Sequence, residues 1–237
     1  MAFSSDEMYT GGAYFMNNPC WDDDYTQWKA GIIHSLLRKN NVYPKTVVDV
    51  GCGAGGILLH LSEKDNNIEK LEGYDISPDA IRLAAKKSNE KLTFHLEDYT
   101  SKPHSSPDLL LCIDVLEHID NVYGFLGQLK KTSGHTIFHI PLDVSCRTIL
   151  KPHVILQQRN AVGHIHYFSQ EMAMWALSDS GFRIIDWVYT KPAVDWEPAD
   201  SFKRNLKKTL RNFSFAINKN LSAKLWGGYS MMILAEG

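Results

Sequence analysis

Cysteine and long apolar runs are scarce in this 237-residue chain, and each scarcity argues against a class of protein. The four cysteines, Cys20, Cys52, Cys112 and Cys146, are scattered without CxxC spacing, which argues against a zinc module and a disulfide scaffold. No stretch approaches the roughly 18 apolar residues of a membrane span. The N-terminal sequence MAFSSDEMYT lacks the basic and apolar regions of a secretory signal. We therefore expect a cytoplasmic protein with reduced thiols.

A strong excess of charge of either sign is also absent. Lys and Arg number 25 and Asp and Glu 27, so the net charge of −2 gives no global attraction to nucleic acid or to an anionic membrane. Hydrophobic residues make up 44% and charged residues 22%, which is ordinary for a globular protein. With no internal repeat, the length predicts one large domain or one domain with additions, and we expect no nucleic-acid partner.

Strand and helix patterns alternate along most of the chain. Apolar and β-branched runs predict strands at 46–50, 68–74, 92–96, 109–115, 136–140, 182–189 and 229–235. Helical patterns lie between them at 57–62, 80–87, 120–131 and 169–180. This alternation indicates an α/β fold with a mostly parallel sheet and right-handed crossovers. The last two strands need no crossover helix if they pair antiparallel.

Three segments depart from this alternation. Residues 1–44 are rich in aromatics and predict an N-terminal helical cap over a domain at 45–237. Residues 141–163 and 191–228 are predicted insertions. Within the second, a basic amphipathic helix is predicted at 202–217 from basic residues flanking an apolar stripe of Phe202, Leu206, Leu210, Phe213 and Ile217.

The glycine-rich segment VVDVGCGAGG, residues 47–56, allows two interpretations. Its glycines satisfy the dinucleotide pattern GxGxxG, and together with Asp49 they satisfy the DxGxGxG pattern of S-adenosylmethionine binding. Asp49 distinguishes the two, because a buried carboxylate at a strand end repels a pyrophosphate but suits an ammonium and a sulfonium. Two later acids are predicted to bind the adenosine. Asp75, at the end of the second strand, can accept hydrogen bonds from the ribose hydroxyls, and Asp98, after the third strand, can accept one from the adenine amino group.

The segments VVDVGCGAGG, GYDISPDAI, LEDY and LLLCIDVLEHI, in this order and spacing, resemble class I S-adenosylmethionine-dependent methyltransferases of the small-molecule branch with a VLEHI-type motif. The resemblance covers about residues 45–190 and the last strand. It implies a Rossmann-like sheet of seven strands, with helices on both faces, in the order 3-2-1-4-5-7-6 and the last strand antiparallel. It implies S-adenosyl-L-methionine as cofactor, bound at Asp49, Gly51, Gly53, Gly55, Asp75, Ile76, Asp98, Tyr99, Ile113 and His118.

Several histidines fall at the carboxyl edge of the sheet, where α/β folds bind ligands. We predict His166 and then His164 as catalytic bases, because a histidine titrates near neutrality and can take the proton of a hydroxyl acceptor. His139, with Tyr25 and Trp28 of the cap, is a candidate acceptor contact. An HxH pair can also ligate a metal, but no nearby Cys or acidic set completes one, so we expect no metal.

These patterns predict methyl transfer from S-adenosylmethionine to a small polar metabolite, with oxygen of a sugar or another biosynthetic intermediate as the favoured acceptor. N-methylation is one alternative. The basic helix at 202–217 also admits a phosphate-bearing or phosphonate-bearing acceptor, or contact with an anionic surface where a lipid-linked acceptor lies. A further alternative is a non-catalytic S-adenosylmethionine-binding module.

Overall fold

A computed structural model of the chain describes residues 5–18, 25–132, 134–195 and 202–237. Its strands form one sheet in the order β3-β2-β1-β4-β5-β7-β6, which confirms the predicted order. Neighbouring strands pair parallel from β3 to β5, and β7 runs antiparallel to β5 and β6. The strands of the described residues are β1 (Thr46–Val50), β2 (Lys70–Asp75), β3 (Leu92–Leu96), β4 (Leu109–Ile113), β5 (His135–Pro141), β6 (Arg183–Thr190) and β7 (Ser230–Glu236).

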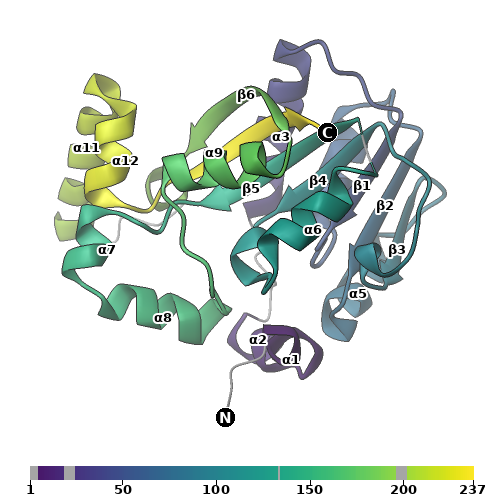
Figure 1. The fold of residues 1–237 in the computed structure, drawn as a ribbon, viewed down its shortest axis with the longest axis horizontal. Helices are drawn as coiled ribbons and strands as arrows, with labels where there is room; N and C mark the ends of the chain where they lie inside the picture. The colour runs from purple at the N-terminus through teal and green to yellow at the C-terminus, as the bar shows by residue number, and fades with distance from the viewer. Residues whose placement is uncertain (1–4, 19–24, 133, 196–201) are drawn as a thin grey trace.

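Helices cover both faces of the sheet (Figure 1). Buried side chains of α3 (Thr26–Lys39) and α4 (Gly56–Lys64) pack against one face. Those of α6 (Val122–Leu129) and α9 (Gln170–Asp179) pack against the other. The shorter α5 (Pro78–Ala84) contacts β2 and β3 and is followed by the 3₁₀ turn η2 (Ala85–Lys87).

Strand β4 is apolar at every position because helices cover both of its faces. Leu109, Leu111 and Ile113 belong to the core under α3 and α4, whereas Leu110 and Cys112 belong to the core under α6 and α9. Successive side chains of a strand point to opposite faces, so a strand covered on both sides must be apolar at every position. Both cores meet at this strand, which lies in the middle of the sheet.

Both predicted insertions carry helices. Residues 141–163 contain α7 (Cys146–Leu150) and α8 (His153–Val162), and residues 191–228 contain α10 (Pro192–Asp195), α11 (Phe202–Ile217) and α12 (Lys219–Trp226). Helix α11 spans the residues that the sequence predicted. In Figure 1, α7, α11 and α12 gather at one end of the sheet, and α12 contacts both α7 and α11.

Two short N-terminal helices, α1 (Ser5–Thr10) and α2 (Ala13–Asn17), lie next to α8. The Tyr9 hydroxyl donates to the carbonyl of Val162 at 3.0 Å. Within the predicted helical cap, residues 19–24 lie outside the described residues. The boundary predicted at residue 44 stays a prediction. Among the described helices, none is both long and apolar enough to cross a membrane.

Leu111→Ala tests the central strand. Leu111 is fully buried, so we expect the substitution to lower the free energy of unfolding by about 2–5 kcal/mol through lost burial and a residual cavity. Urea unfolding followed by circular dichroism measures the change. Leu96→Ala is the matched control, because Leu96 is 55% exposed and should change stability little. Equal losses at both positions would contradict this account of the core.

Candidate active site

The turn after β1 adopts a backbone that glycine favours. Gly51, Gly53 and Gly55 have φ angles of 74°, 54° and 77°, in the left-handed region that other residues rarely adopt. A Cβ on Gly51 would lie 2.5 Å from a side-chain methyl of Val115, and one on Gly55 would lie 2.4 Å from the ring of Phe94. The turn therefore combines a sharp bend into α4 with close packing on two neighbouring segments.

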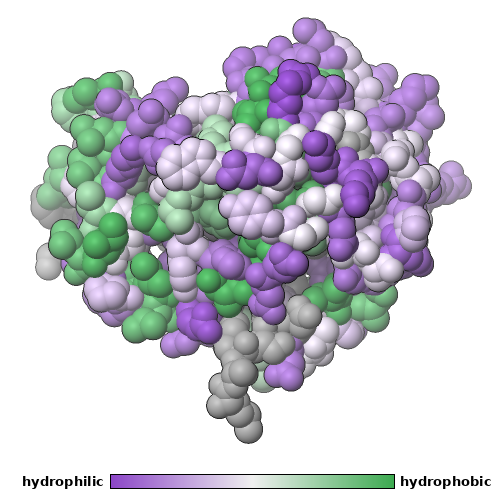
Figure 2. All heavy atoms as spheres, in the orientation of Figure 1, coloured by the Kyte–Doolittle hydropathy of each residue, from purple (hydrophilic) through white to green (hydrophobic). Residues whose placement is uncertain are grey.

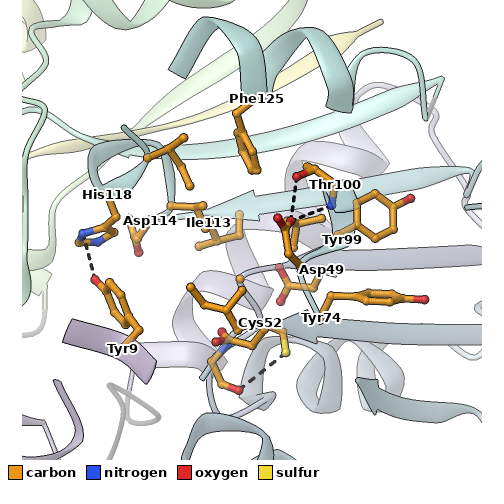
Figure 3. Close-up of a pocket in the computed structure, with 18 of the residues that line it drawn as sticks. Tyr9, Asp49, Cys52, Tyr74, Tyr99, Thr100, Ile113, Asp114, His118 and Phe125 are labelled. Atoms are coloured by element: carbon orange, nitrogen blue, oxygen red, sulfur yellow. Dashed lines mark hydrogen bonds between the residues drawn. The ribbon is translucent and has the colours of Figure 1, made fainter. Parts of the chain in front are cut away.

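A cavity of about 440 Å³ opens at this turn, over the carboxyl ends of β1, β2 and β4 (Figure 3). Its volume lies in the range of small-molecule sites, roughly 300–1,000 Å³. The structure brings most of the predicted cofactor residues to its wall: Asp49, Gly51, Gly53, Asp75, Ile76, Asp98, Tyr99, Ile113 and His118. Gly55 is not part of the wall and instead begins α4 against Phe94.

Asp49 is a buried acid that faces the cavity. Its side chain is 1% exposed, and within the described residues its Oδ1 has no hydrogen-bond partner. Burial, with repulsion from Asp75, raises the pKa of Asp49 well above its usual range. A cationic group in the cavity would supply both the missing partner and the missing charge. The ammonium of S-adenosylmethionine fits this requirement.

The charge of the cavity wall also favours a cationic ligand. Among the described residues that line it, six are acidic and only Lys29 is a lysine or arginine; the acids are Asp49, Asp75, Glu97, Asp98, Asp114 and Asp120. Such a wall attracts a cationic donor and repels a pyrophosphate.

Two of these acids are fixed by the backbone around them. Asp75 accepts hydrogen bonds from the backbone amides of Gly53 and Ser77, each at 2.8 Å. Asp98 accepts from the backbone amide and the hydroxyl of Thr100, both at 2.8 Å, and thereby begins the 3₁₀ turn η3 (Tyr99–Ser101). Both carboxylates are therefore held at the cavity wall by the loops that carry them. Their predicted contacts with ribose and adenine stay predictions.

A second polar cluster at the cavity centres on Asp114, directly after β4. Its Oδ2 accepts from Lys29 Nζ at 2.6 Å, and its Oδ1 accepts from His139 Nδ1 at 2.5 Å. His139 Nε2 lies 2.8 Å from the hydroxyl of Thr190. Burial alone would raise the pKa of Asp114, but His139 and Lys29 outweigh it and hold the pKa well below its usual range. This low pKa favours the carboxylate form of Asp114, whose backbone is left-handed with φ of 55°.

Asp114, Lys29 and Thr190 have no role predicted from the sequence. The sequence could have indicated Asp114 as a site residue, because it is an acid within the motif IDVLEHI at the carboxyl end of a buried strand. Lys29 lies on α3 and Thr190 ends β6, and no local pattern links either residue to β4. Lys29 reaches Asp114 directly from α3, and Thr190 is linked to Asp114 only through His139 of β5, so the cluster depends on how these distant elements pack.

Two histidines and two acids meet beside this cluster. His118, in the 3₁₀ turn η4 (Leu116–His118), lies 3.0 Å from the Tyr9 hydroxyl and 3.1 Å from the Gly163 carbonyl through its Nδ1. Burial, followed by repulsion from His164, lowers the pKa of His118 to about 4, so its imidazole is neutral at neutral pH. His164 Nδ1 in turn donates to Asp143 Oδ2 at 2.8 Å.

Glu117 completes the group and is almost fully buried. Burial and the charge of Asp114 raise its pKa, which favours a neutral carboxyl. Of the described residues, Glu117, His118 and His164 form the one group whose donor atoms, all within 4.8 Å of one another, could hold a metal ion. The expectation that the protein binds no metal stays a prediction.

The remaining predicted residues lie close to the cavity without lining it. His166 donates its backbone amide to the Glu117 carbonyl at 3.0 Å, and His164 stacks edge-on against His118 with ring centroids 5.0 Å apart. Tyr25 and Trp28 are half-buried at the start of α3, where their neighbours Thr26 and Lys29 line the cavity instead. His139 does not line the cavity but contacts Asp114, which does. Their roles toward an acceptor stay predictions.

A family model described as a methyltransferase domain matches residues 23–186. The chain belongs to this methyltransferase family. This membership, with the cavity and its buried acid, confirms the prediction of a class I S-adenosylmethionine-dependent methyltransferase and of S-adenosylmethionine as its methyl donor.

Curated relatives of this methyltransferase include enzymes that act on different atoms. It is 26% identical over 221 residues to norajmaline N-methyltransferase of Rauvolfia serpentina, a match that covers 88% of this chain and 72% of that enzyme. It is 31% identical over 112 residues to the ubiquinone biosynthesis O-methyltransferase of Vibrio campbellii, which covers 44% of this chain and 46% of that enzyme. The match thus spans less than half of the Vibrio enzyme.

Solved structures show the same fold at low identity. Magnesium protoporphyrin IX methyltransferase of Synechocystis PCC 6803, with bound SAH, superposes with a TM-score of 0.60 at 18% identity and covers 89% of this chain and 82% of that one. A methyltransferase of Haloferax volcanii, described as putative and solved in complex with the activator Trm112, superposes with a TM-score of 0.65 at 16% identity, covering 99% and 97%.

Asp49 gives a pH-dependent prediction. A bound ammonium stabilises the carboxylate of Asp49, so cofactor binding should release a proton wherever the free protein holds Asp49 protonated. The affinity for S-adenosylhomocysteine should therefore rise as the pH rises toward the raised pKa of Asp49 and level off above it. Titration calorimetry in buffers of different ionisation enthalpy counts the protons.

Asp49→Asn should weaken S-adenosylhomocysteine about ten- to hundredfold, the cost of a lost charge-assisted hydrogen bond. It should also remove the proton release. The control is Asp179→Asn on the exposed end of α9, which should change neither quantity. If Asp49→Asn kept full affinity and full proton release, Asp49 would not contact the cofactor.

Proposed function

We propose that the protein methylates a hydroxyl group of a small polar metabolite, with a sugar or another biosynthetic intermediate as the acceptor. One observation carries this proposal: the anion Asp114 lies in the cavity wall one residue after Ile113, the predicted contact of the methionine end. A hydroxyl that donates to this carboxylate would lie next to the reacting end of the cofactor.

S-adenosylmethionine supplies an electrophilic methyl group, so the protein mainly has to align the two reactants and exclude water. In this proposal Asp49 holds the cofactor ammonium and Asp114 accepts a hydrogen bond from the acceptor hydroxyl. Lys29 and His139 are positioning residues, because they fix both oxygens of Asp114 at 2.6 and 2.5 Å. The Thr190 hydroxyl lies 2.8 Å from His139 Nε2 and holds the other side of the imidazole.

Asp114 is a poor base, since its pKa is held well below its usual range. The proton of the hydroxyl therefore needs another acceptor, and His166 and His164 stay our proposed bases. His164 has a feature that supports it: its Nδ1 donates to the carboxylate of Asp143 at 2.8 Å. A carboxylate in this place orients an imidazole and stabilises the cation that forms when Nε2 takes a proton.

N-methylation is the second candidate, and the acidic wall of the cavity favours it. A cationic amine would be attracted to Asp114 and the other acids, although it has to lose a proton before it can accept the methyl group. The relative from Rauvolfia serpentina is an N-methyltransferase. A phosphate-bearing acceptor is less favoured, because the described part of α11 supplies no residue to the cavity wall.

The proposed partner is a small molecule, which the cavity volume of about 440 Å³ supports. We propose a cytoplasmic location, because Cys52 and Cys112 are buried free thiols.

Transfer of a labelled methyl group to a panel of acceptors tests the function. The panel pairs each sugar or hydroxy compound with its amino analogue, and mass spectrometry of the product locates the methyl group. We expect methylation of the hydroxy members. Methylation of the amino members alone would favour N-methylation, and no transfer to any member in the presence of bound cofactor would favour a non-catalytic module.

Variants separate alignment from proton removal. Asp114→Asn should lower kcat/KM about 10²-fold and weaken acceptor binding, because the anion that receives the hydroxyl is lost. His164→Ala or His166→Ala should lower kcat about 10²-fold or more, depending on which residue is the base, with little change in KM. His153→Ala, on the exposed start of α8, is the control. Full activity in both histidine variants would exclude them as bases.

A further inference from the structure

Helix α11 packs on the protein with the less apolar of its two faces. Arg211 is 7% exposed, and its guanidinium donates to the Trp226 carbonyl at 3.4 Å. Phe215 stacks on the buried ring of Tyr229, with centroids 5.3 Å apart. The predicted apolar stripe lies on the opposite face and points away from the protein.

The exposure of the stripe is large for apolar side chains. Leu206, Leu210, Phe213 and Ile217 are 49%, 42%, 67% and 70% exposed. They recur at intervals of four, three and four residues, so they form one continuous line along the helix. Helix α11 therefore presents its apolar stripe to the surroundings, whereas a surface helix ordinarily turns this stripe to the core.

Neighbouring helices extend this surface. Leu221 and Leu225 are exposed on α12, one turn apart, and Ile149 and Leu150 are 66% and 80% exposed on α7. We call these eight residues of α7, α11 and α12 the apolar ridge. Figure 2 shows apolar side chains gathered at this end of the molecule, where Figure 1 places the three helices. Contiguous exposed apolar surface of this kind marks an interaction site.

The segment that carries most of the apolar ridge is basic. Residues 202–228 carry seven lysines and arginines and no acid, although Arg211 lies on the buried face of α11. Lys207 and Lys219 are exposed on α11 and α12. Lys224 pairs with Glu171 of α9, so part of the basic charge is already used within the protein. The remaining charge is local, because the whole chain has a net charge of −2.

We propose that α7, α11 and α12 dock the protein on an anionic lipid membrane. The apolar ridge enters the boundary between headgroups and acyl chains, and the surrounding lysines contact the phosphate of the headgroups. An apolar face flanked by Lys and Arg is what a helix lying in such an interface requires. A second copy of the chain fits less well, because two identical basic surfaces would repel each other.

Co-sedimentation of the full chain with vesicles tests this proposal. We expect binding to phosphatidylcholine vesicles that contain phosphatidylglycerol, little binding to phosphatidylcholine alone, and weaker binding at high salt. Phe213→Ser should weaken binding about tenfold, because binding scales with the apolar area buried. Lys207→Glu with Lys219→Glu should weaken it tenfold or more, since two attractive charges become repulsive.

Matched controls are Tyr43→Ser before β1 and Lys91→Glu before the edge strand β3, two exposed positions outside α7, α11 and α12, which should bind like the parent chain. Circular dichroism and cofactor titration show that each variant is folded. Equal binding to neutral vesicles, or unchanged binding by Phe213→Ser, would overturn the proposal. So would displacement by millimolar inorganic phosphate, which indicates a simple anion site, or a dimer in solution that Phe213→Ser dissociates.

Discussion

The site is built around one unfavourable feature, a carboxylate that is removed from water before any ligand is present. Asp49 is the penultimate residue of β1 inside the sheet, and its Oδ1 has no partner within the described residues. Such a group favours protonation unless a cation joins it. The glycine turn completes the arrangement, because its left-handed backbone lets the main chain approach a ligand closely. The buried carboxyl of Asp49 therefore favours a ligand that brings a positive charge.

In the proposed function, a second constraint acts where the acceptor hydroxyl would bind. Asp114 is held by Lys29 from α3 and by His139 from β5, and His139 is held by Thr190 from β6. Each contact comes from a different element, so the position of the carboxylate depends on the whole sheet edge. Methyl transfer depends on alignment more than on activation of the donor, and a rigid anion at this edge meets that need.

The third feature is the orientation of α11. An amphipathic helix predicts a buried apolar stripe, yet here the stripe is exposed and the buried face carries Arg211. The protein gains little burial energy from Leu206, Leu210, Phe213 and Ile217, which are 42% to 70% exposed. The proposed membrane contact would account for this exposed stripe. The basic charge around it is compatible with a lipid surface, even though the net charge of the chain is slightly negative.

The amino-acid sequence alone predicts the order of the elements, the sheet topology through the family resemblance, and most of the predicted cofactor residues that line the cavity. These are local signals: β-branched runs, a glycine turn, and acids at strand ends, each set by a few adjacent residues. Leu109–Ile113 predicts a strand covered on both faces because every position is apolar. Tertiary packing, in contrast, sets which distant side chains meet and which way an amphipathic helix faces. Lys29, Asp114, His139 and Thr190 are spread over more than half of the chain, and α11 has the same periodicity whether its stripe points inward or outward. Neither result is encoded in a local pattern, because both depend on how elements pack against one another.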